Sequence, residues 1–205
     1  ARVVAPLYGS VDPENHFPVL KREEFLACLS YLGTYAEDRR EKVQRLFFEP
    51  ASKIPEQRFL LCGAQYPENL QLTSNVAFIS HVPPSLHPAL FSSCRATLNV
   101  TRGVMARFGY CPSGRLFEAA ACGAPLLSDR WEGLELFFSP GRELFPVDTA
   151  EDVIAALSLS DAELRATAKA ARERTLAEHT GSHRIVELEH ICESLPRHAS
   201  AMECA

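Results

Sequence analysis

The segment from Pro112 to Pro125 reads PSGRLFEAAACGAP, and its residue types divide it into a loop, a helix and a stop. Small residues at 112–114 lead into a run of good helix formers. Gly123, with a proline two residues later, gives the usual order of signals that end a helix. We therefore expect a helix over residues 113–122. The apolar residues 125–128 that follow predict a strand, so the segment forms one unit of an alternating α/β fold.

The same alternation of apolar runs and helical patterns continues on both sides of this segment. Glycine closes several apolar runs, and the helical segments show apolar residues at helical spacing or a capping box in their first turn. The expected strands are 29–34, 58–63, 75–79, 96–100, 125–128 and 144–147, and the expected helices are 38–49, 86–93, 113–122, two beginning near 150 and 161, and 183–194. This order predicts an α/β fold, a Rossmann-like doubly wound parallel sheet flanked by helices. Such sheets bind ligands beyond the carboxyl ends of their strands.

The chain has 205 residues, which is enough for one domain with a proper core. Residues 1–20 carry three prolines and little periodicity, which predicts an interdomain linker or arm. Residues 21–195 contain the alternating pattern and form the expected domain. The last segment, 196–205, is expected to be a flexible tail.

Composition and charge argue against several classes of protein. The formal net charge of −5 and the pI near 5.8 argue against a nucleic-acid partner. The sequence has no apolar run long enough for a transmembrane helix, and its first residues do not resemble a signal peptide. The seven cysteines include no C-x-x-C pair, and the histidines lack metal-ligand spacing. We therefore expect no metal site and a reducing, cytoplasmic location.

The start of the expected helix 113–122 is suited to a phosphate. Backbone N–H groups at a helix start have no partner within the helix and carry the positive end of its dipole. Gly114 has no side chain to block an approaching phosphate. Glu118, one turn further, can accept hydrogen bonds from two neighbouring hydroxyls, such as a ribose diol. The alternative is a buried, alanine-rich helix with Glu118 at its edge, and the residue chemistry alone leaves both interpretations open.

Several ordered blocks of the sequence resemble one group of enzymes. The stretch Leu116–Ser128 is similar to the donor-site signature of GT-B-fold glycosyltransferases of the family-4, or group-1, type. Together with three more blocks it resembles the CgeB-like (spore maturation) branch over residues 29 to 158. These blocks are Leu29–Tyr35, Leu98–Arg102 and Trp131–Leu134. The arm at residues 5–18 is similar to the segment that joins the two domains of such enzymes.

The resemblance implies a nucleotide-binding role for three groups of residues. Glu118 matches the glutamate that holds the nucleotide ribose. The backbone amides of Ser113, Gly114 and Arg115 match the turn that binds the diphosphate. The loop of Gly33 and Thr34 matches the glycine loop that lies near the phosphates.

Further contacts follow from the resemblance with an alternative attached to each. The family-4 pattern has a cationic pair near the glycine loop, for which Arg39, Arg40 and Lys42 are candidates; the alternative is a solvated helix face. Arg102 ends a strand, where it can pair with a diphosphate or bond a loop carbonyl. The loop expected beside the base contains His81 and Val82, and the alternative for His81 is a structural role.

The resemblance also implies an activity and a missing partner domain. The intact enzyme would transfer a sugar from a nucleoside diphosphate sugar to an acceptor, without a metal or another cofactor, and the acceptor site would lie on a preceding N-terminal domain. The isolated chain is then expected to bind the donor without transferring it. Tyr110 departs from the family-4 pattern, which has a second glutamate eight positions before Glu118, so the sugar contacts and the stereochemical outcome stay open. The alternative function is a non-catalytic nucleotide-binding or interaction module that has kept the fold.

Overall fold

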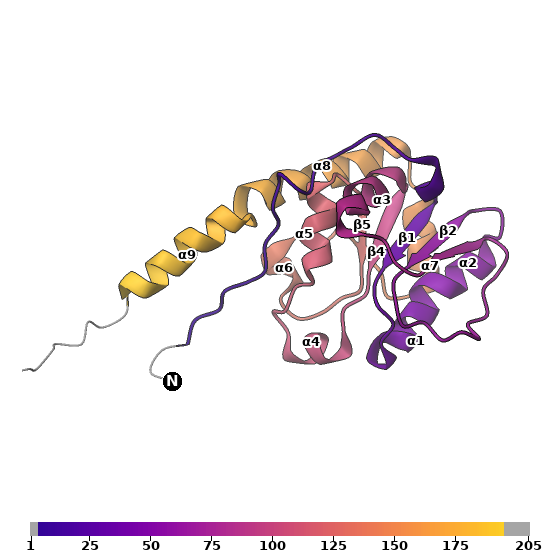
Figure 1. The fold of residues 1–205 in the computed structure, drawn as a ribbon, viewed down its shortest axis with the longest axis horizontal. Coiled ribbons are helices and arrows are strands. Elements are labelled where there is room, and N and C mark those ends of the chain that lie inside the picture. Colours follow the sequence, from indigo (N-terminus) through magenta and orange to yellow (C-terminus); the bar gives the residue numbers. More distant parts are fainter. Residues whose placement is uncertain (1–3, 195–205) are drawn as a thin grey trace, which may run out of the picture.

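A single sheet of six parallel strands forms the centre of the molecule (Figure 1). The computed structural model describes residues 4–194, so the expected tail 196–205 lies outside the described part. The strands are β1 (Leu29–Leu32), β2 (Phe59–Cys62), β3 (Val76–Ile79), β4 (Ala96–Asn99), β5 (Leu126–Ser128) and β6 (Phe145–Pro146). Their order is β3-β2-β1-β4-β5-β6. The chain adds strands on one side of β1 up to β3 and then on the other side from β4 onward, as in doubly wound sheets. The predicted fold class and all six expected strands are confirmed.

Helices cover both faces of this sheet. In chain order they are η1 (Glu23–Phe25), η2 (Glu37–Arg39), α1 (Arg40–Val43), the π-helical turn η3 (Gln44–Phe48), α2 (Glu49–Lys53), η4 (Pro84–Leu86), α3 (His87–Ser93), α4 (Gly103–Phe108), α5 (Gly114–Ala121), α6 (Leu134–Phe137), α7 (Ala150–Leu157), α8 (Asp161–Glu178) and α9 (Gly181–Ser194). Buried residues of α1, η3, α2 and α7 form one core cluster with the sheet, whereas those of α3 and α5 belong to clusters on the other face. Helix α8 packs against α5 as a further cover.

The expected helices are present, and their start signals work as predicted. Thr149 and Ser160 each form a complete capping box, which opens α7 and α8 respectively. The helix expected over residues 38–49 is continuous from η2 to α2, with one π-helical turn in its middle. The short elements η1, α4 and α6 were not predicted.

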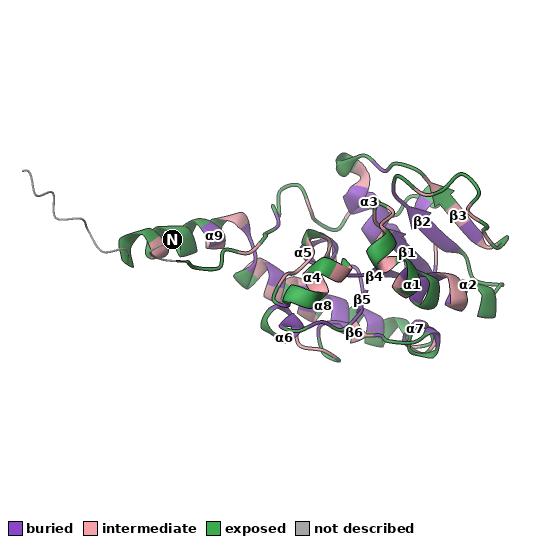
Figure 2. Ribbon diagram, turned by 90° about the horizontal axis from the view of Figure 1, so that it is seen from below, coloured by how far each residue is buried: buried purple, intermediate pink, exposed green. Residues whose placement is uncertain are grey.

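The N-terminal arm packs against the junction between α8 and α9. Val11 is 2% exposed and forms a β-bridge with Thr180. Its N–H donates to the His179 carbonyl at 3.0 Å, and the Gly181 N–H donates to the Val11 carbonyl at 3.2 Å. Figures 1 and 2 show the arm running beside α9, which projects away from the sheet. Its role as a linker between domains stays a prediction.

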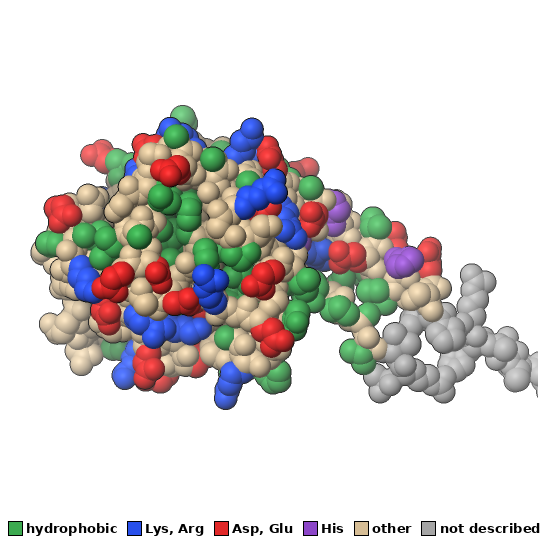
Figure 3. Space-filling model, turned by 180° about the vertical axis from the view of Figure 1, so that it is seen from behind, with side chains coloured by type: hydrophobic (Ala, Val, Ile, Leu, Met, Phe, Trp, Pro, Cys, Tyr) green, Lys and Arg blue, Asp and Glu red, His purple; other side chains and the backbone are tan. Residues whose placement is uncertain are grey.

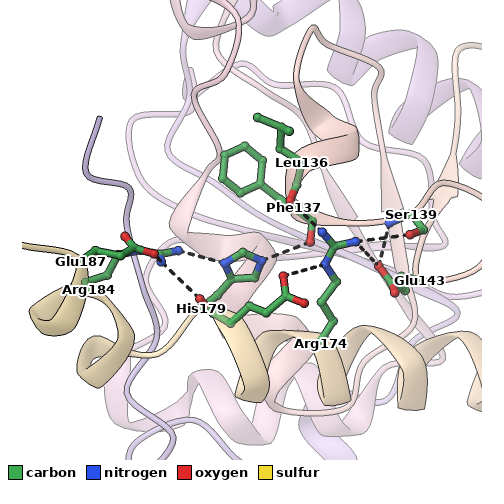
Figure 4. A network of polar contacts seen from close by, with 9 residues as sticks. Leu136, Phe137, Ser139, Glu143, Arg174, His179, Arg184 and Glu187 are labelled. Carbon is green, nitrogen blue, oxygen red and sulfur yellow. Dashed lines mark hydrogen bonds and ion pairs between the residues drawn. The ribbon is translucent and has the colours of Figure 1, made fainter. Parts of the chain in front are cut away.

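A buried arginine fastens this junction (Figure 4). Arg184 is 8% exposed, and its guanidinium donates to the carbonyls of Tyr8 and Gly9 at 3.2 and 3.3 Å. It also contacts the His179 ring at 2.9 Å. Burial and the Arg184 charge lower the pKa of His179. This imidazole is therefore held in its neutral form, which can accept a hydrogen bond from Arg184.

The described part of the chain has a surface of mixed charge and thiols that are not paired with one another. The face in Figure 3 mixes acidic and basic side chains. Within residues 4–194, no helix has the length and the apolar composition needed to span a bilayer. Four cysteines are buried, and none of the described ones forms a disulfide. These four thiols are those of Cys28, Cys62, Cys94 and Cys122.

Candidate functional site

Helix α5 begins at the edge of the sheet where the parallel strands end. The connection from β4 to β5 passes through α5, so this helix runs antiparallel to the strands and its first turn lies beyond their carboxyl ends. Ser113 is the N-cap, and its hydroxyl accepts a hydrogen bond from the Arg115 N–H at 3.3 Å. Gly114 is exposed, and a Cβ built there would have the Glu118 Oε1 atom, at 3.7 Å, as its nearest contact. The predicted turn and the predicted carboxylate therefore share one surface.

The Glu118 carboxylate is surrounded by basic side chains. The guanidinium of Arg115 donates a hydrogen bond to Oε2, which also lies 3.6 Å from Nδ1 of His87 and 3.9 Å from Nε2 of His16. Burial raises the pKa of Glu118, but the hydrogen bond from His87 and the charges of Arg115 and His16 outweigh it and lower the pKa below its usual range. Glu118 is therefore ionised at neutral pH, the state that accepts hydrogen bonds from hydroxyl groups.

His87 joins this carboxylate to the loop that was expected beside the base. Its Nε2 atom lies 3.2 Å from the Val82 carbonyl, and its Nδ1 atom faces Glu118. Val82 itself is buried, whereas His81 is exposed in the same loop. The structure thus brings the expected base loop close to the expected ribose ligand, through a residue that was not predicted. An isolated histidine in an apolar helix carries no sequence signal for such a role.

The glycine loop after β1 is packed closely against two side chains. A Cβ on Gly33 would lie 2.8 Å from the Tyr31 hydroxyl and 3.0 Å from Nη2 of Arg39. The Arg39 guanidinium donates to the Thr34 carbonyl, and to the Val100 carbonyl at 3.3 Å. Arg39 therefore ties the ends of β1 and β4 together at the edge of the sheet. A diphosphate would have to compete with these carbonyls, and its binding by Arg39 stays a prediction.

The other cations at this edge of the sheet are paired with carboxylates. Arg102 Nε lies 2.8 Å from Oδ1 of Asp38, and Arg102 is largely exposed. Lys42 Nζ lies 2.6 Å from Oδ2 of Asp129. Arg40 pairs with Glu37 at 3.4 Å on the helix surface. Binding of a diphosphate by Arg102 or Lys42 would compete with these carboxylates and stays a prediction, while Arg40 belongs to an exposed ion pair.

Asp129 is a buried residue of this edge that sequence reasoning missed. It is 2% exposed and accepts hydrogen bonds from the N–H and the hydroxyl of Thr101, both at 2.9 Å. With the Lys42 ammonium, these bonds join the loops after β4 and β5 to the first helix. An aspartate directly after an apolar strand run was the signal available in the sequence.

Three side chains at Glu118 also have the composition of a metal site. Ligand atoms of His16, His87 and Glu118 all lie within 4.8 Å of one another. Arg115, however, donates to the same carboxylate oxygen and approaches Nδ1 of His87 at 3.4 Å. A guanidinium in this position repels a cation, so the electrostatics favour an anionic or hydroxyl-bearing ligand over a metal.

Tyr110, the departure from the family-4 pattern, closes a neighbouring turn. Its φ of 49° is in the left-handed region, and its N–H donates to the Glu132 carbonyl at 2.6 Å. A Cβ on Gly133 would lie 2.4 Å from the Tyr110 ring, so this ring covers the glycine. Tyr110 is half-exposed, and a phenol here cannot supply the negative charge of a carboxylate at neutral pH.

A separate cavity of about 250 Å³ lies on the opposite face of the sheet. It is walled by Tyr31, Tyr35, Phe48 and Tyr66, residues of the α1 side. Glu118 and Arg115 are on α5, which packs on the other face. Arg39 and Arg40 also line this cavity, but the ionised carboxylate and the open helix start are at Glu118, so we centre the candidate site there.

A sequence profile of the glycosyl transferase-like family matches residues 39–190, which is well over half of the chain. The chain belongs to the glycosyl transferase-like family. The match includes α5 and the whole surround of Glu118 except the arm residue His16. Among curated proteins, none matches this sequence.

Solved structures with a similar fold include a sucrose-phosphate synthase and two proteins in complex with UDP and glucose or with UDP-glucose. Sucrose-phosphate synthase from Thermosynechococcus elongatus superposes with a TM-score of 0.72 at 17% identity, over 91% of this chain and 51% of that one. Anabaena HepE, in complex with UDP and glucose, superposes with a TM-score of 0.63 at 14% identity, over 83% of this chain and 48% of that one. The T4 phage protein BGT, in complex with UDP-glucose, superposes with a TM-score of 0.61 at 16% identity, over 85% of this chain and 48% of that one. This member of the family thus spans about half the length of these structures and shares their fold.

Proposed function

We propose that this chain is the nucleotide-sugar-binding half of a two-domain, GT-B-type glycosyltransferase. In this proposal Glu118 holds the ribose of the donor, and the amides at Ser113–Arg115 bind its diphosphate. The intact enzyme transfers the sugar to an acceptor bound by another domain, without a metal. The chain spans about half of the similar structures, which leaves room for such a domain.

One observation carries this proposal. An ionised carboxylate, Glu118, lies one turn from the open N-terminus of an eight-residue helix at the carboxyl edge of the sheet. The helix start favours phosphate, and the carboxylate favours a pair of hydroxyls at the distance of one helical turn. A nucleoside diphosphate carries both groups, joined by a ribose carbon. A buried alanine-rich helix, the alternative weighed from sequence, would not need an exposed glycine at its start.

The same arrangement is suited to catalysis of sugar transfer. As the bond between the sugar and the diphosphate breaks, negative charge grows on the departing diphosphate. Amides at 113–115 that face this charge would stabilise the transition state more than the ground state, and the Arg115 guanidinium, which contacts Glu118, adds positive charge beside them. Arg102 and Lys42 are further cations within the same edge of the sheet. We propose that these groups take the place that a metal ion has in other transferases.

Three finer assignments belong to the same proposal. The sequence blocks support membership of the CgeB-like branch. The UDP and UDP-glucose in the HepE and BGT structures make UDP-sugars the first donors to test. The buried, unpaired thiols support a reducing compartment such as the cytoplasm.

The second candidate function is a non-catalytic module that binds a nucleotide or a protein partner. Tyr110 favours it, because the carboxylate expected at that position in the family-4 pattern is replaced by a neutral phenol. The intact pair of Glu118 and Arg115 favours the enzyme, because a module without nucleotide-dependent function would not need an ionised carboxylate at a helix start.

A thermal-shift panel tests the proposed function. The chain is mixed with UDP, GDP, ADP and TDP, and with their sugars, and the same panel is run on Glu118→Ala. A ligand at a hundredfold excess over its dissociation constant adds about 2.7 kcal/mol to the free energy of unfolding, which is a clear rise in Tm. Glu118→Ala should abolish the rise for the nucleotide that binds.

The matched control is Glu173→Ala, which removes an exposed glutamate of α8. It should leave the nucleotide response unchanged. EDTA should also leave it unchanged if binding needs no metal. A wild-type chain that responds to none of the nucleotides would refute the proposed function and favour the interaction module. Sugar transfer by residues 1–205 alone would refute the need for a second domain.

A further inference from the structure

The arm residue His16 reaches the carboxylate of Glu118 from outside the domain. A tight turn directs it there: the Asp12 carboxylate accepts from the Glu14 N–H at 2.9 Å and from Asn15 Nδ2 at 2.6 Å, and the Asp12 carbonyl accepts from the His16 N–H at 2.9 Å. The imidazole Nε2 then lies 3.9 Å from Glu118 Oε2.

Both nitrogens of His16 are shielded from solvent, and neither has a hydrogen-bond partner among the described residues. Each nitrogen of an imidazole can donate or accept one hydrogen bond. Shielding both nitrogens from water without partners costs free energy of folding. A well-formed turn nevertheless holds the ring in this place. The unpaired nitrogens therefore point to a partner that arrives with a ligand.

The distance between His16 and Glu118 fits a shared hydroxyl group. An oxygen at about 2.8 Å from each of two atoms can bridge a gap of up to about 5.6 Å. The observed 3.9 Å between Nε2 and Oε2 lies within this limit. The hydroxyl can donate to the ionised carboxylate and accept from an N–H at Nε2, which gives a partner to Glu118 Oε2 and to one of the two unpaired His16 nitrogens.

We propose that His16 is a donor-contact residue, whose Nε2–H donates a hydrogen bond to a ribose hydroxyl of the nucleotide held by Glu118. This inference rests on the proposed function and adds to it a residue of the arm. The ribose subsite is then completed by a segment outside the matched region 39–190, so the arm is part of the site as well as a connection.

A divalent metal is the competing partner, since His16, His87 and Glu118 supply three ligand atoms. A metal ion here would be repelled by the Arg115 guanidinium, which is hydrogen-bonded to the same carboxylate oxygen. The ribose hydroxyl needs no displacement of this charge. We therefore retain the hydroxyl as the partner and include zinc in the test.

The test is a double-mutant cycle between protein and ligand, measured by isothermal titration calorimetry on the full chain. The ligands are UDP, 2′-deoxy-UDP and 3′-deoxy-UDP, or the corresponding set of GDP or ADP if the nucleotide panel selects another base. The variants are His16→Phe, which keeps a ring of similar shape, and His190→Phe, which changes an exposed histidine of α9 as the control.

The expected result is a loss of about tenfold in UDP affinity for His16→Phe, the effect of one hydrogen bond. For the deoxy nucleotide that lacks the contacted hydroxyl, His16→Phe and the wild type should have the same affinity. His190→Phe should match the wild type with every ligand. His16→Asn, which keeps a donor and an acceptor, should fall between wild type and His16→Phe and serves in place of the latter if that variant is unstable.

Two outcomes overturn the inference while the proposed function stands. In one, wild type binds a nucleotide and Glu118→Ala abolishes it, but His16→Phe weakens all three ligands equally or none of them. In the other, Zn²⁺ binds wild type in a saturable way that His16→Phe abolishes, while the preference for UDP over its deoxy forms is unchanged. A wild type that binds no nucleotide overturns the proposed function and the inference together.

Discussion

The Glu118 carboxylate and the His87 imidazole lie 3.6 Å apart, although they belong to α5 and α3, two different crossover helices. The other nitrogen of His87 contacts the Val82 carbonyl at 3.2 Å. One buried ring therefore connects the carboxylate of the candidate site to the loop after β3.

We expect His87→Phe to raise the pKa of Glu118. Burial raises this pKa, and the His87 hydrogen bond is the first of the contributions that lower it, ahead of the Arg115 and His16 charges. Without this hydrogen bond, the effect of burial on the Glu118 pKa is less compensated, so the pKa rises. A phenylalanine at position 87 keeps the edge-to-face contact with Phe91. An NMR titration of the Glu118 side-chain carboxyl in both proteins measures the shift. An unchanged titration midpoint would contradict the geometry.

The same variant should change the dependence of stability on pH. A carboxylate whose pKa is lower in the folded state contributes stability above its unfolded pKa, and this contribution is lost as the pH falls through the folded pKa. The free energy of unfolding should therefore differ between wild type and His87→Phe by about 1–2 kcal/mol near pH 7, and the difference should shrink as the pH falls through the folded-state pKa of Glu118. Urea unfolding at a series of pH values checks this, and a constant difference would speak against it.

The strands were predictable because their apolar runs are short and bounded by glycine or polar residues. Phe59 to Cys62, for example, is a fully buried run with Gly63 directly after it. Helices α7 and α8 were predictable from the local chemistry of Thr149 and Ser160. By contrast, α4 and α6 are a turn or two long and begin without a side-chain cap, so their sequences contain no start signal.

The candidate site was predictable only in its local part. Ser113 and Glu118 are on one helix, so the sequence spacing fixes their relation. His16 and His87 reach Glu118 through tertiary packing of the arm and of α3, which no local pattern encodes. Arg39 and Arg102 were located at the right edge of the sheet, but their carbonyl and carboxylate partners depend on how the loops pack.

Asp129→Ala should destabilise the protein by about 3 kcal/mol. The aspartate is buried and satisfies Thr101, and its loss leaves the Lys42 ammonium without its partner. Asp148→Ala is the control, because its ion pair with Arg130 is half-exposed and should be worth less than about 1 kcal/mol. Urea unfolding of both variants compares the two, and equal effects would show that burial of Asp129 does not matter.

Gly63→Ala should cost about 3 kcal/mol or more. Gly63 has a φ of 143°, and a Cβ there would lie 2.1 Å from the Gly33 carbonyl oxygen, so both the backbone and the space forbid a side chain. Gly9→Ala is the matched control, because a Cβ at Gly9 has no heavy atom within 4 Å among the described residues. It should change stability by less than about 1 kcal/mol. Chemical unfolding distinguishes these results, and a tolerated Gly63→Ala would show that the β1 and β2 loops are not held this close.

Arg184→Met should release the N-terminal arm from the junction of α8 and α9. The methionine fills part of the space, but the carbonyls of Tyr8 and Gly9 lose their donor. The His179 ring also loses its contact with the guanidinium (Figure 4). We expect a loss of about 2–3 kcal/mol.

Amide hydrogen exchange should then speed up at Val11, whose N–H bonds to the junction, while the sheet keeps its protection. Arg165→Met, on the exposed face of α8, should leave that exchange rate unchanged. Equal protection of Val11 in the two variants would mean that the β-bridge alone holds the arm. Because His16 follows in the same arm, release by Arg184→Met should also weaken nucleotide binding, whereas Arg165→Met should not.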